Sequence, residues 1–437
     1  MDERQVVELT RRPNRPTIPW LFEVTLLLFV AGLLLQNVYP WLPPTNRLLG
    51  AYLALLAIYS WTQRRGGIPA EVALFAAFVA WGVLTGLLFA ADRSLVLESG
   101  RLISQELVLL FALAEYATAR RAPTFAFLLL LVVPLGLWWY AHSTGELSNA
   151  QAGVGKDWRA SSLMTNPNVA GTLCVYGLFG VAYHLWNRKR QGLVVWPLLA
   201  LPFIGITLLA SGSRSRVLSL GVFVLTWASI AYGRGTRSKL RSALLLLMVA
   251  AALFLAGRFI VESTPLGERF RQAATTPHFD DNRYRLYMDG WMMLQQEPVY
   301  GVGLGNFVIR SSLPGQYAHS DSIETLATTG IVGFALYSCI YVVLWFRLRR
   351  VLKKRSDATS RYVLGLYQAI LITTLFVGLY TPNFLNPLHL YIVGLMVGHT
   401  RAMEQDLPGT RPADSGMTKD VTSSLTVSVR RASRSSP

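Results

Sequence analysis

The chain has 437 residues, of which 52% are hydrophobic and 15% are charged, and its formal net charge is +17. Soluble domains carry about 25% charged residues, so this composition excludes a soluble globular enzyme, and its hydrophobicity excludes a disordered chain. The two cysteines, Cys174 and Cys339, lie in separate apolar runs, which excludes a disulfide scaffold.

Apolar windows of about 19 residues predict about twelve transmembrane helices. The predicted spans lie at 19–36, 48–62, 69–91, 103–119, 124–143, 166–186, 193–210, 217–233, 242–257, 323–346, 362–380 and 388–403. We therefore expect an all-α, polytopic membrane protein, with spans 1 to 9 in residues 19–257 and spans 10 to 12 in residues 323–403. Residues 1–18 precede the first span, and residues 404–437 lack the apolar content to fold and are expected to be a disordered tail.

Lysine and arginine residues gather in alternate loops of this predicted topology. They cluster at 64–65, 120–121, 188–190, 234–241 and 347–361, and in both terminal segments. Cytoplasmic loops are enriched in these cations, so both termini should be cytoplasmic. The net charge of +17 then reflects topology and attraction to anionic membrane lipids, not nucleic-acid binding.

The longest predicted loop, residues 258–322, lies on the outer side of the membrane in this topology. Within it, residues 283–297 place Leu286, Tyr287, Gly290, Trp291 and Leu294 at helical spacing. This pattern predicts an amphipathic helix that lies against the membrane or covers a cavity. The glycine run Gly301-Val302-Gly303-Leu304-Gly305 predicts a turn next to that helix. A loop of this length is usually functional.

Four polar motifs open predicted spans that enter from the outer side. They are Asn166-Pro167-Asn168, Ser211 to Arg214, His319 to Asp321, and Asn383 to Pro387. A helix N-terminus presents free amide N–H groups and a positive dipole end, so it suits an anion. Asparagine and serine before proline also serve simply to start helices. The sequence leaves both interpretations open.

Outer-side arginine and histidine residues supply the candidate chemistry. Arg214, beside Ser213 and Arg216, would either anchor the headgroup region or bind a phosphorylated lipid. His319 precedes a helix that Asp321 could cap, with Glu324 in capping-box spacing. An imidazolium is disfavoured at a helix N-terminus, so His319 should stay neutral at pH 7 and could act as a general base, unless its role is structural. Metal-ligand spacings such as His-x-x-x-His and Cys-x-x-Cys are absent, so we expect no metal or other cofactor.

In their order along the chain, these motifs resemble the bacterial O-antigen ligase superfamily over about residues 150–400. The same superfamily contains O-antigen polymerases and protein O-oligosaccharyltransferases. The motifs are Arg159 to Asn168, Gly212-Ser213-Arg214, Arg283 ahead of Pro298, Gly301-x-Gly303-x-Gly305-x-Phe307, His319, and Gly330-Ile-Val-Gly333. The family pattern usually has asparagine after the histidine, where this chain has Ser320.

The resemblance implies a membrane-embedded C-type glycosyltransferase that is inverting and metal-independent. It implies a bacterial inner-membrane protein whose active site faces the periplasm, so that residues 258–322 would be a periplasmic loop. The donor would be a glycan on undecaprenyl diphosphate, and for a ligase the acceptor would be the lipid A-core oligosaccharide of lipopolysaccharide.

The resemblance also implies roles for individual residues. Arg214 and Arg283 would hold the diphosphate, because without a metal its developing charge must be met by arginines and helix N-termini. His319 would take the proton from the acceptor hydroxyl. Supporting substrate contacts are expected from Arg159, Arg285 and Asn168, and contacts to phosphates of the acceptor from Lys156, Arg216 and Arg310. Arg285 is a close rival to Arg283 for the diphosphate.

Three alternatives remain at this stage. An O-antigen polymerase and a protein O-oligosaccharyltransferase would use the same kind of donor with another acceptor. A transporter of lipid-linked glycans would place ionisable residues near mid-membrane and show inverted repeats. The acids within spans are expected to lie mostly near span ends, which disfavours transport; they are Glu23, Glu71, Glu106 and Glu115.

Overall fold

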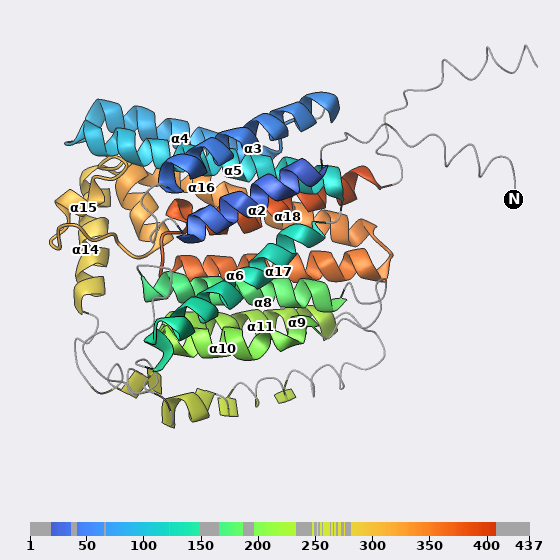
Figure 1. Cartoon of the computed structure of the whole chain (residues 1–437). Helices are drawn as coiled ribbons and strands as arrows, with labels where there is room; N and C mark the ends of the chain where they lie inside the picture. Colours follow the sequence, from blue (N-terminus) through green and yellow to red (C-terminus); the bar gives the residue numbers. More distant parts are fainter. Residues whose placement is uncertain are drawn as a thin grey trace, which may run out of the picture.

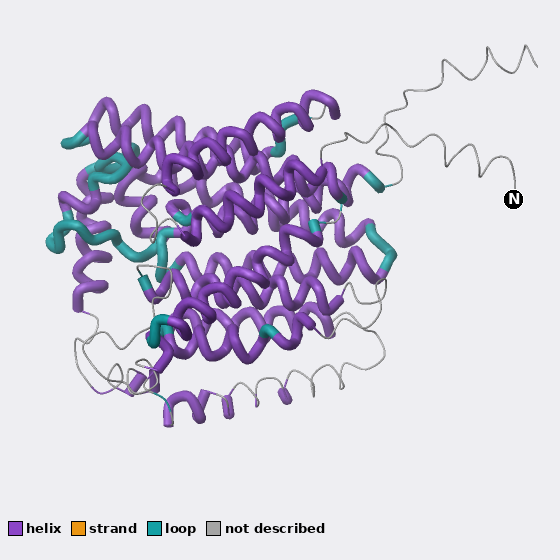
Figure 2. The backbone as a smooth tube through the Cα atoms, in the orientation of Figure 1, coloured by secondary structure: helices purple, strands orange, loops and turns teal. Residues whose placement is uncertain are grey.

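The computed structural model describes residues 19–35, 42–64, 67–121, 123–148, 166–186, 196–232 and 281–407, with short pieces between 247 and 275. Every regular element in these ranges is a helix (Figure 2). The predictions for residues 1–18, for the tail after 407 and for most of span 242–257 lie outside the described residues, as do Lys156 and Arg159.

Helix formation follows the apolar segments of the sequence. The helices are α2 (Pro19–Leu35), α3 (Leu42–Arg64), α4 (Ala70–Phe89), α5 (Arg93–Arg120), α6 (Thr124–Ser143), α8 (Pro167–Trp186), α9 (Trp196–Leu199), α10 (Leu201–Ala210), α11 (Arg214–Tyr232), α14 (Asp281–Gln296), α15 (Phe307–Arg310), α16 (Asp321–Lys354), α17 (Ala358–Gly378), the 3-10 helix η2 (Asn383–Leu385) and α18 (Pro387–Gln405). Each predicted span other than 242–257 overlaps one of them.

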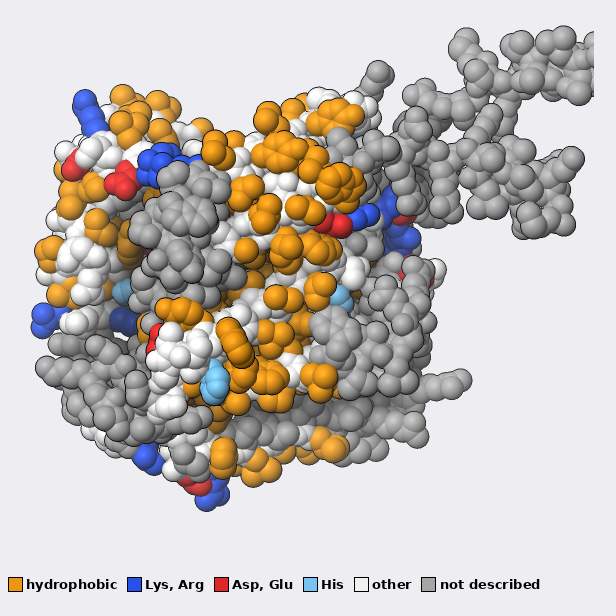
Figure 3. Space-filling model, viewed as in Figure 1, with side chains coloured by type: hydrophobic (Ala, Val, Ile, Leu, Met, Phe, Trp, Pro, Cys, Tyr) orange, Lys and Arg blue, Asp and Glu red, His pale blue; other side chains and the backbone are white. Residues whose placement is uncertain are grey.

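Six described helices, α4, α5, α6, α8, α16 and α17, are long and apolar enough to cross a membrane. The long helices run side by side as one bundle (Figure 1). Hydrophobic side chains cover the middle of the face shown in Figure 3, and charged side chains lie mostly toward its left and right ends. A bilayer solvates such an apolar belt, so the chain is a polytopic membrane protein. The count of about twelve spans stays a prediction.

Helix α5 begins ahead of the predicted span 103–119. The Asp92 carboxylate caps it by accepting from the backbone N–H groups of Ser94 at 2.8 Å and Leu95 at 3.3 Å. The charged residues of the first turns, such as Glu98 and Arg101, kept this part outside the apolar window. Glu106 therefore lies near the middle of α5, and the expectation that it sits near a span end is wrong.

One end of the bundle is joined by ion pairs between arginine and glutamate. Glu115 on α5 pairs with Arg64 of α3 and with Arg401 of α18, the latter at 3.3 Å. Glu71 at the start of α4 pairs with Arg347 of α16 at 2.8 Å. The structure therefore brings Arg64, Arg347 and Arg401, which lie in or beside segments predicted to be cytoplasmic, to a single end of the bundle.

Helix α14 lies across the other end of the bundle, which we call the α14 end (Figure 1). The predicted amphipathic helix at 283–297 is confirmed. Leu286 and Met293 are buried, whereas Trp291 is 51% exposed. The buried face centres on Leu286, Gly290 and Met293, which share one side of the helix. A side chain at Gly290 would collide with Ile323, so α14 packs closely on α16 at this point.

Helix α16 is interrupted at Gly330, which has φ 66° and ψ −172°. The interruption frees the carbonyls of Ala327 and Thr328, which accept from the backbone N–H groups of Val302 and Gly303 at 2.9 Å each. The loop after α14 thus completes the hydrogen bonds that the broken helix leaves open.

The glycine run turns as the sequence predicts. Gly301, Gly303 and Gly305 have φ values of 69°, 95° and 76°, which glycine adopts at no steric cost. The Asn306 side chain then bonds the backbone of Asp92, accepting from its N–H at 2.9 Å and donating to its carbonyl at 3.0 Å. The loop is therefore fastened both to α16 and to the corner between α4 and α5.

Candidate active site

His319 lies in the loop just before α16, with φ 56° in the left-handed region. The loop is held by Glu324, whose carboxylate accepts from the Ala318 N–H at 2.6 Å. Ser320 is the N-cap residue of α16, without a side-chain capping bond. The predicted cap by Asp321 and the predicted capping box with Glu324 are therefore wrong, because the Asp321 carboxylate accepts from the backbone of residues 383–384 and the Glu324 carboxylate accepts from the Ala318 N–H.

Asp321 fastens the segment before α18 to the start of α16. Its carboxylate accepts from the backbone N–H groups of Asn383 and of Phe384, the latter at 3.3 Å. It also accepts from the Tyr337 hydroxyl at 3.2 Å. Since Asp321 is buried and His319 lies two residues before it, this network fixes where the histidine stands relative to residues 380–388.

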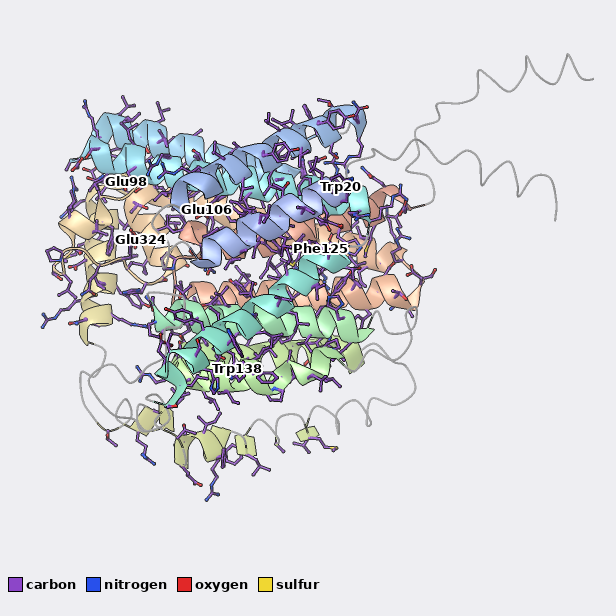
Figure 4. The ribbon with its side chains drawn as sticks, in the orientation of Figure 1. Trp20, Glu98, Glu106, Phe125, Trp138 and Glu324 are labelled. Atoms are coloured by element: carbon purple, nitrogen blue, oxygen red, sulfur yellow. The ribbon has the colours of Figure 1, made fainter. Side chains whose placement is uncertain are left out.

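A cavity of about 1070 Å³ opens beside His319. Its apolar wall comes mainly from α2, α3 and α5 and includes Phe29, Leu53 and Leu109. Its polar lining combines His319 with Glu106 and with residues at the start of α8. Glu106 on α5 and Glu324 on α16 both lie in the half of the bundle nearer α14 (Figure 4). The cavity is thus amphipathic and belongs to the α14 end.

Arg283 on α14 lies within electrostatic range of His319. Burial, and secondarily the Arg283 guanidinium, lower the pKa of His319 from its usual value of 6.5. The same guanidinium lies within electrostatic range of Arg216. Helix α14 is held in place by the Tyr287 hydroxyl, which donates to the Leu379 carbonyl at 3.3 Å. Arg283 therefore acts on two residues, Arg216 and His319, that come from other parts of the chain.

Arg216 is fully buried between helices. Its Nε donates to the Thr172 hydroxyl at 2.6 Å and lies 3.4 Å from the Asn168 carbonyl, and its Nη2 donates to the Thr381 hydroxyl. Arg216 was expected to bind phosphates of an acceptor. Its position ties α8, α11 and the segment after α17 together, and its Nη1 is buried without a described hydrogen-bond partner. A role in binding phosphates stays a prediction.

Arg214 and Asn168 lie close to this junction. Arg214 is half-buried at the first position of α11. Asn168 is half-buried and lines the cavity. The capping interpretation of the Asn-Pro motifs is confirmed. The Asn166 side chain accepts from the Asn168 N–H at 2.9 Å, and the Asn386 side chain accepts from the Leu388 N–H at 3.1 Å.

The remaining predicted residues lie farther out. Arg285 and Arg310 are exposed on α14 and α15, whereas Arg283 is half-buried. None of these three arginines, nor Arg214, belongs to the lining of the cavity beside His319. Arg283, and not Arg285, is thus the arginine that lowers the pKa of His319. Within the described ranges, no group of three or more His, Cys, Asp or Glu side chains is placed to hold a metal ion.

Several residues of the cavity were missed by the sequence analysis. Glu106, Arg47 and Tyr317 all contribute to its lining. Glu106 carried a usable signal, because an ionisable side chain inside a span is a functional candidate by default. Arg47 and Tyr317 sit in polar segments where nothing in the pattern separates a cavity residue from an ordinary surface residue.

Residues 197–338 match the family described as O-antigen ligase, so this part of the chain is an O-antigen ligase domain. No curated protein matches the chain. The matched range includes α11, α14, the glycine run 301–305 and His319, and it ends within α16.

Proposed function

We propose that this O-antigen ligase domain serves a transferase that moves an O-antigen polysaccharide from undecaprenyl diphosphate to a sugar hydroxyl of lipid A-core. The observation that carries the proposal is the amphipathic cavity, which joins a long apolar wall to His319, and Arg283 lies within electrostatic range of that histidine. We propose the bacterial inner membrane as its location, with the α14 end facing the periplasm.

The shape and lining of the cavity suit a lipid-linked donor. The wall built from α2, α3 and α5 is apolar and would take the isoprenoid chain. At the polar end, Arg283 and the N-terminus of α8 supply positive potential for the diphosphate. Arg214 at the first position of α11 would join them, with Arg159 and Arg285 in support.

The proposed reaction is an inverting displacement. The Nε2 or Nδ1 of His319 removes the proton from the acceptor hydroxyl as its oxygen attacks the anomeric carbon of the donor sugar. The bond between that carbon and the diphosphate oxygen breaks, and the leaving diphosphate takes the electron pair. The protonated histidine then returns its proton to solvent. His319 must be neutral to begin this cycle, which agrees with the lowered pKa of its imidazole.

In the proposed reaction, the Arg283 guanidinium has two effects. The Arg283 guanidinium disfavours a charged His319 before the reaction, and it faces the charge that develops on the leaving diphosphate. Removing one such donor from a site of this kind typically lowers the rate by about 100-fold to 1,000-fold. The exposed Arg310, together with Lys156, would contact phosphates of the acceptor core at the mouth of the site.

An acceptor-swap assay tests this function. Purified protein in liposomes receives a lipid-linked glycan together with lipid A-core, with a second lipid-linked glycan, or with a peptide. We expect product on lipid A-core only, and none from His319→Ala. His142→Ala, which changes an exposed histidine stacked on Trp138, is the matched control and should keep full activity. Product on the second lipid-linked glycan would instead identify a polymerase, and product on the peptide a protein O-oligosaccharyltransferase.

A transporter is the candidate from another class. It would move a fluorescent lipid-linked glycan across the bilayer without forming a covalent product. We expect the reverse in the same liposomes, namely covalent transfer in the presence of an acceptor.

A further inference from the structure

Most buried glutamates in the described helices have protein partners. Glu71 pairs with Arg347, Glu115 pairs with Arg401, and Glu324 accepts from the Ala318 N–H. Such pairing is needed because an unpaired buried carboxyl group loses its hydration with no compensation. These three glutamates are therefore explained by the fold itself.

Glu106 is different. Its side chain is only 7% exposed, and its Oε2 is buried with no hydrogen-bond partner among the described residues. Asp321 acts on it electrostatically, but Asp321 is also an acid and supplies no compensating positive charge. The Asp321 oxygens are already engaged by the Asn383 N–H and the Tyr337 hydroxyl, so Asp321 does not satisfy Glu106.

The cavity is where a partner for Glu106 can enter. Glu106 lines the same cavity as His319, and its neighbour Gln105 does so as well. Both polar side chains come from α5, where Leu102, Val108 and Leu109 also line the cavity. Two polar groups set within an apolar wall are a common way to orient one ligand by hydrogen bonds.

The hydrogen-bonding chemistry of the carboxyl group restricts what it can bind. The diphosphate is better placed near the Arg283 guanidinium, whose charge is opposite to its own. An isoprenoid chain has no hydrogen to donate. The remaining part of a lipid-linked glycan is its sugar, whose hydroxyl and amide hydrogens are suitable donors to the carboxyl oxygens.

We propose that Glu106 binds a hydroxyl or amide hydrogen of the sugar joined directly to the diphosphate, and so selects that sugar. The proposal rests on the proposed function and assigns a specificity residue to the same site. Gln105 lies beside it as a second polar contact for the sugar.

Steady-state kinetics with lipid-linked glycans tests this assignment. Glu106→Leu should raise the KM for the donor by about 10-fold or more, because a site built to hydrogen-bond loses strongly when the bond is removed. Glu106→Gln keeps a carbonyl acceptor and should stay within a few-fold of the unmodified protein. Glu98→Leu is the matched control, since Glu98 lies on the same helix but is exposed (Figure 4). Inhibition by sugar-free undecaprenyl diphosphate should be equal in all four proteins.

A donor series keeps the test valid if Glu106→Leu does not fold. With the unmodified protein, a donor that lacks one hydroxyl on its first sugar should have a KM about 10-fold higher, an increase like that caused by Glu106→Leu. If Glu106→Leu folds, that analogue should cost it nothing further.

Three outcomes would overturn the assignment. They are an unchanged donor KM in Glu106→Leu, an equal loss of affinity for sugar-free undecaprenyl diphosphate, and a magnesium requirement that Glu106→Gln abolishes. Complete inactivity of the unmodified protein on lipid-linked glycans would instead contradict the proposed function. The two failures are therefore distinguishable.

Discussion

His319 combines a left-handed backbone with a half-buried side chain. A conformation of this kind costs a non-glycine residue about 1 kcal/mol or more and persists only where neighbouring contacts enforce it. The bond from Ala318 to Glu324 on one side and the contacts of Asp321 on the other provide that enforcement. The rigid backbone presents the imidazole to the cavity.

The pH dependence of transfer should report the environment of His319. Its pKa lies below 6.5 because of burial and of Arg283, so the neutral base persists as the pH falls below 6.5. Arg283→Gln removes the smaller of the two causes and should raise this pKa part of the way back. The acid limb of kcat/KM, measured from pH 4.5 to 8, should therefore move to higher pH in the variant. A limb that stays in place or moves to lower pH would show that Arg283 does not act on His319.

Arg216 should matter for stability as well as activity. Arg216→Ala removes hydrogen bonds to Thr172 and Thr381 and leaves a cavity where three segments meet. We expect a loss of about 3 kcal/mol or more in the free energy of unfolding. Thermal unfolding in detergent measures it, with the exposed Arg285→Ala as the control that keeps the midpoint. A midpoint for Arg216→Ala equal to that of the control would refute the structural role.

At the scale of elements, the interruption of α16 organises the α14 end. Gly330 occupies a backbone region that is essentially restricted to glycine, and a side chain there would meet the backbone of Val299. The loop after α14, which contains the glycine run 301–305, carries the chain toward His319. The break is therefore one of the features that set the position of Arg283 relative to His319.

Gly330→Ala should destabilise the protein and lower its activity together. The strained backbone costs about 1–3 kcal/mol, to which the contact with Val299 adds. Gly136→Ala is the control, because Gly136 lies inside α6 with open space around it, where alanine favours the helix. The unfolding midpoint and the transfer rate should both fall in Gly330→Ala. In Gly136→Ala the midpoint should stay the same or rise, and the transfer rate should not fall. Equal midpoints and equal transfer rates in the two variants would mean that the loop with the glycine run 301–305 does not need the interruption of α16.

The elements were predictable to different degrees. Apolar windows located the helices because burial in a bilayer requires long apolar runs, but they missed the charged first turns of α5 and so misplaced Glu106. Periodicity found α14, yet Trp291 faces outward because the partner surface on α16, not hydrophobicity alone, chose the buried face. The contacts of Asp321 with Asn383 and Phe384 join segments far apart in sequence, and no local pattern encodes them.

At the scale of the whole molecule, charges divide the bundle into two unlike ends. Arginines at one end are neutralised by glutamates such as Glu71 and Glu115. At the α14 end, Arg283 faces a histidine and another arginine instead. This asymmetry suits a protein that anchors itself on the cytoplasmic side and binds an anion on the other.

Cysteine labelling checks this orientation. In a background with Cys174→Ala and Cys339→Ser, we expect Gln316→Cys to react with a membrane-impermeant maleimide in intact cells whose outer membrane is permeabilised. Lys354→Cys, exposed at the opposite end of α16, should react only after lysis. The reversed pattern would place the α14 end in the cytoplasm and contradict the proposed topology.

The most direct measurement separates binding from chemistry in a single turnover. Labelled lipid-linked glycan is bound to excess protein in liposomes, lipid A-core is added, and both bound donor and product are followed. We predict that His319→Ala binds the donor normally and forms no product, whereas Arg283→Ala loses donor binding as well. Product formation by His319→Ala at the rate of the unmodified protein would contradict the account.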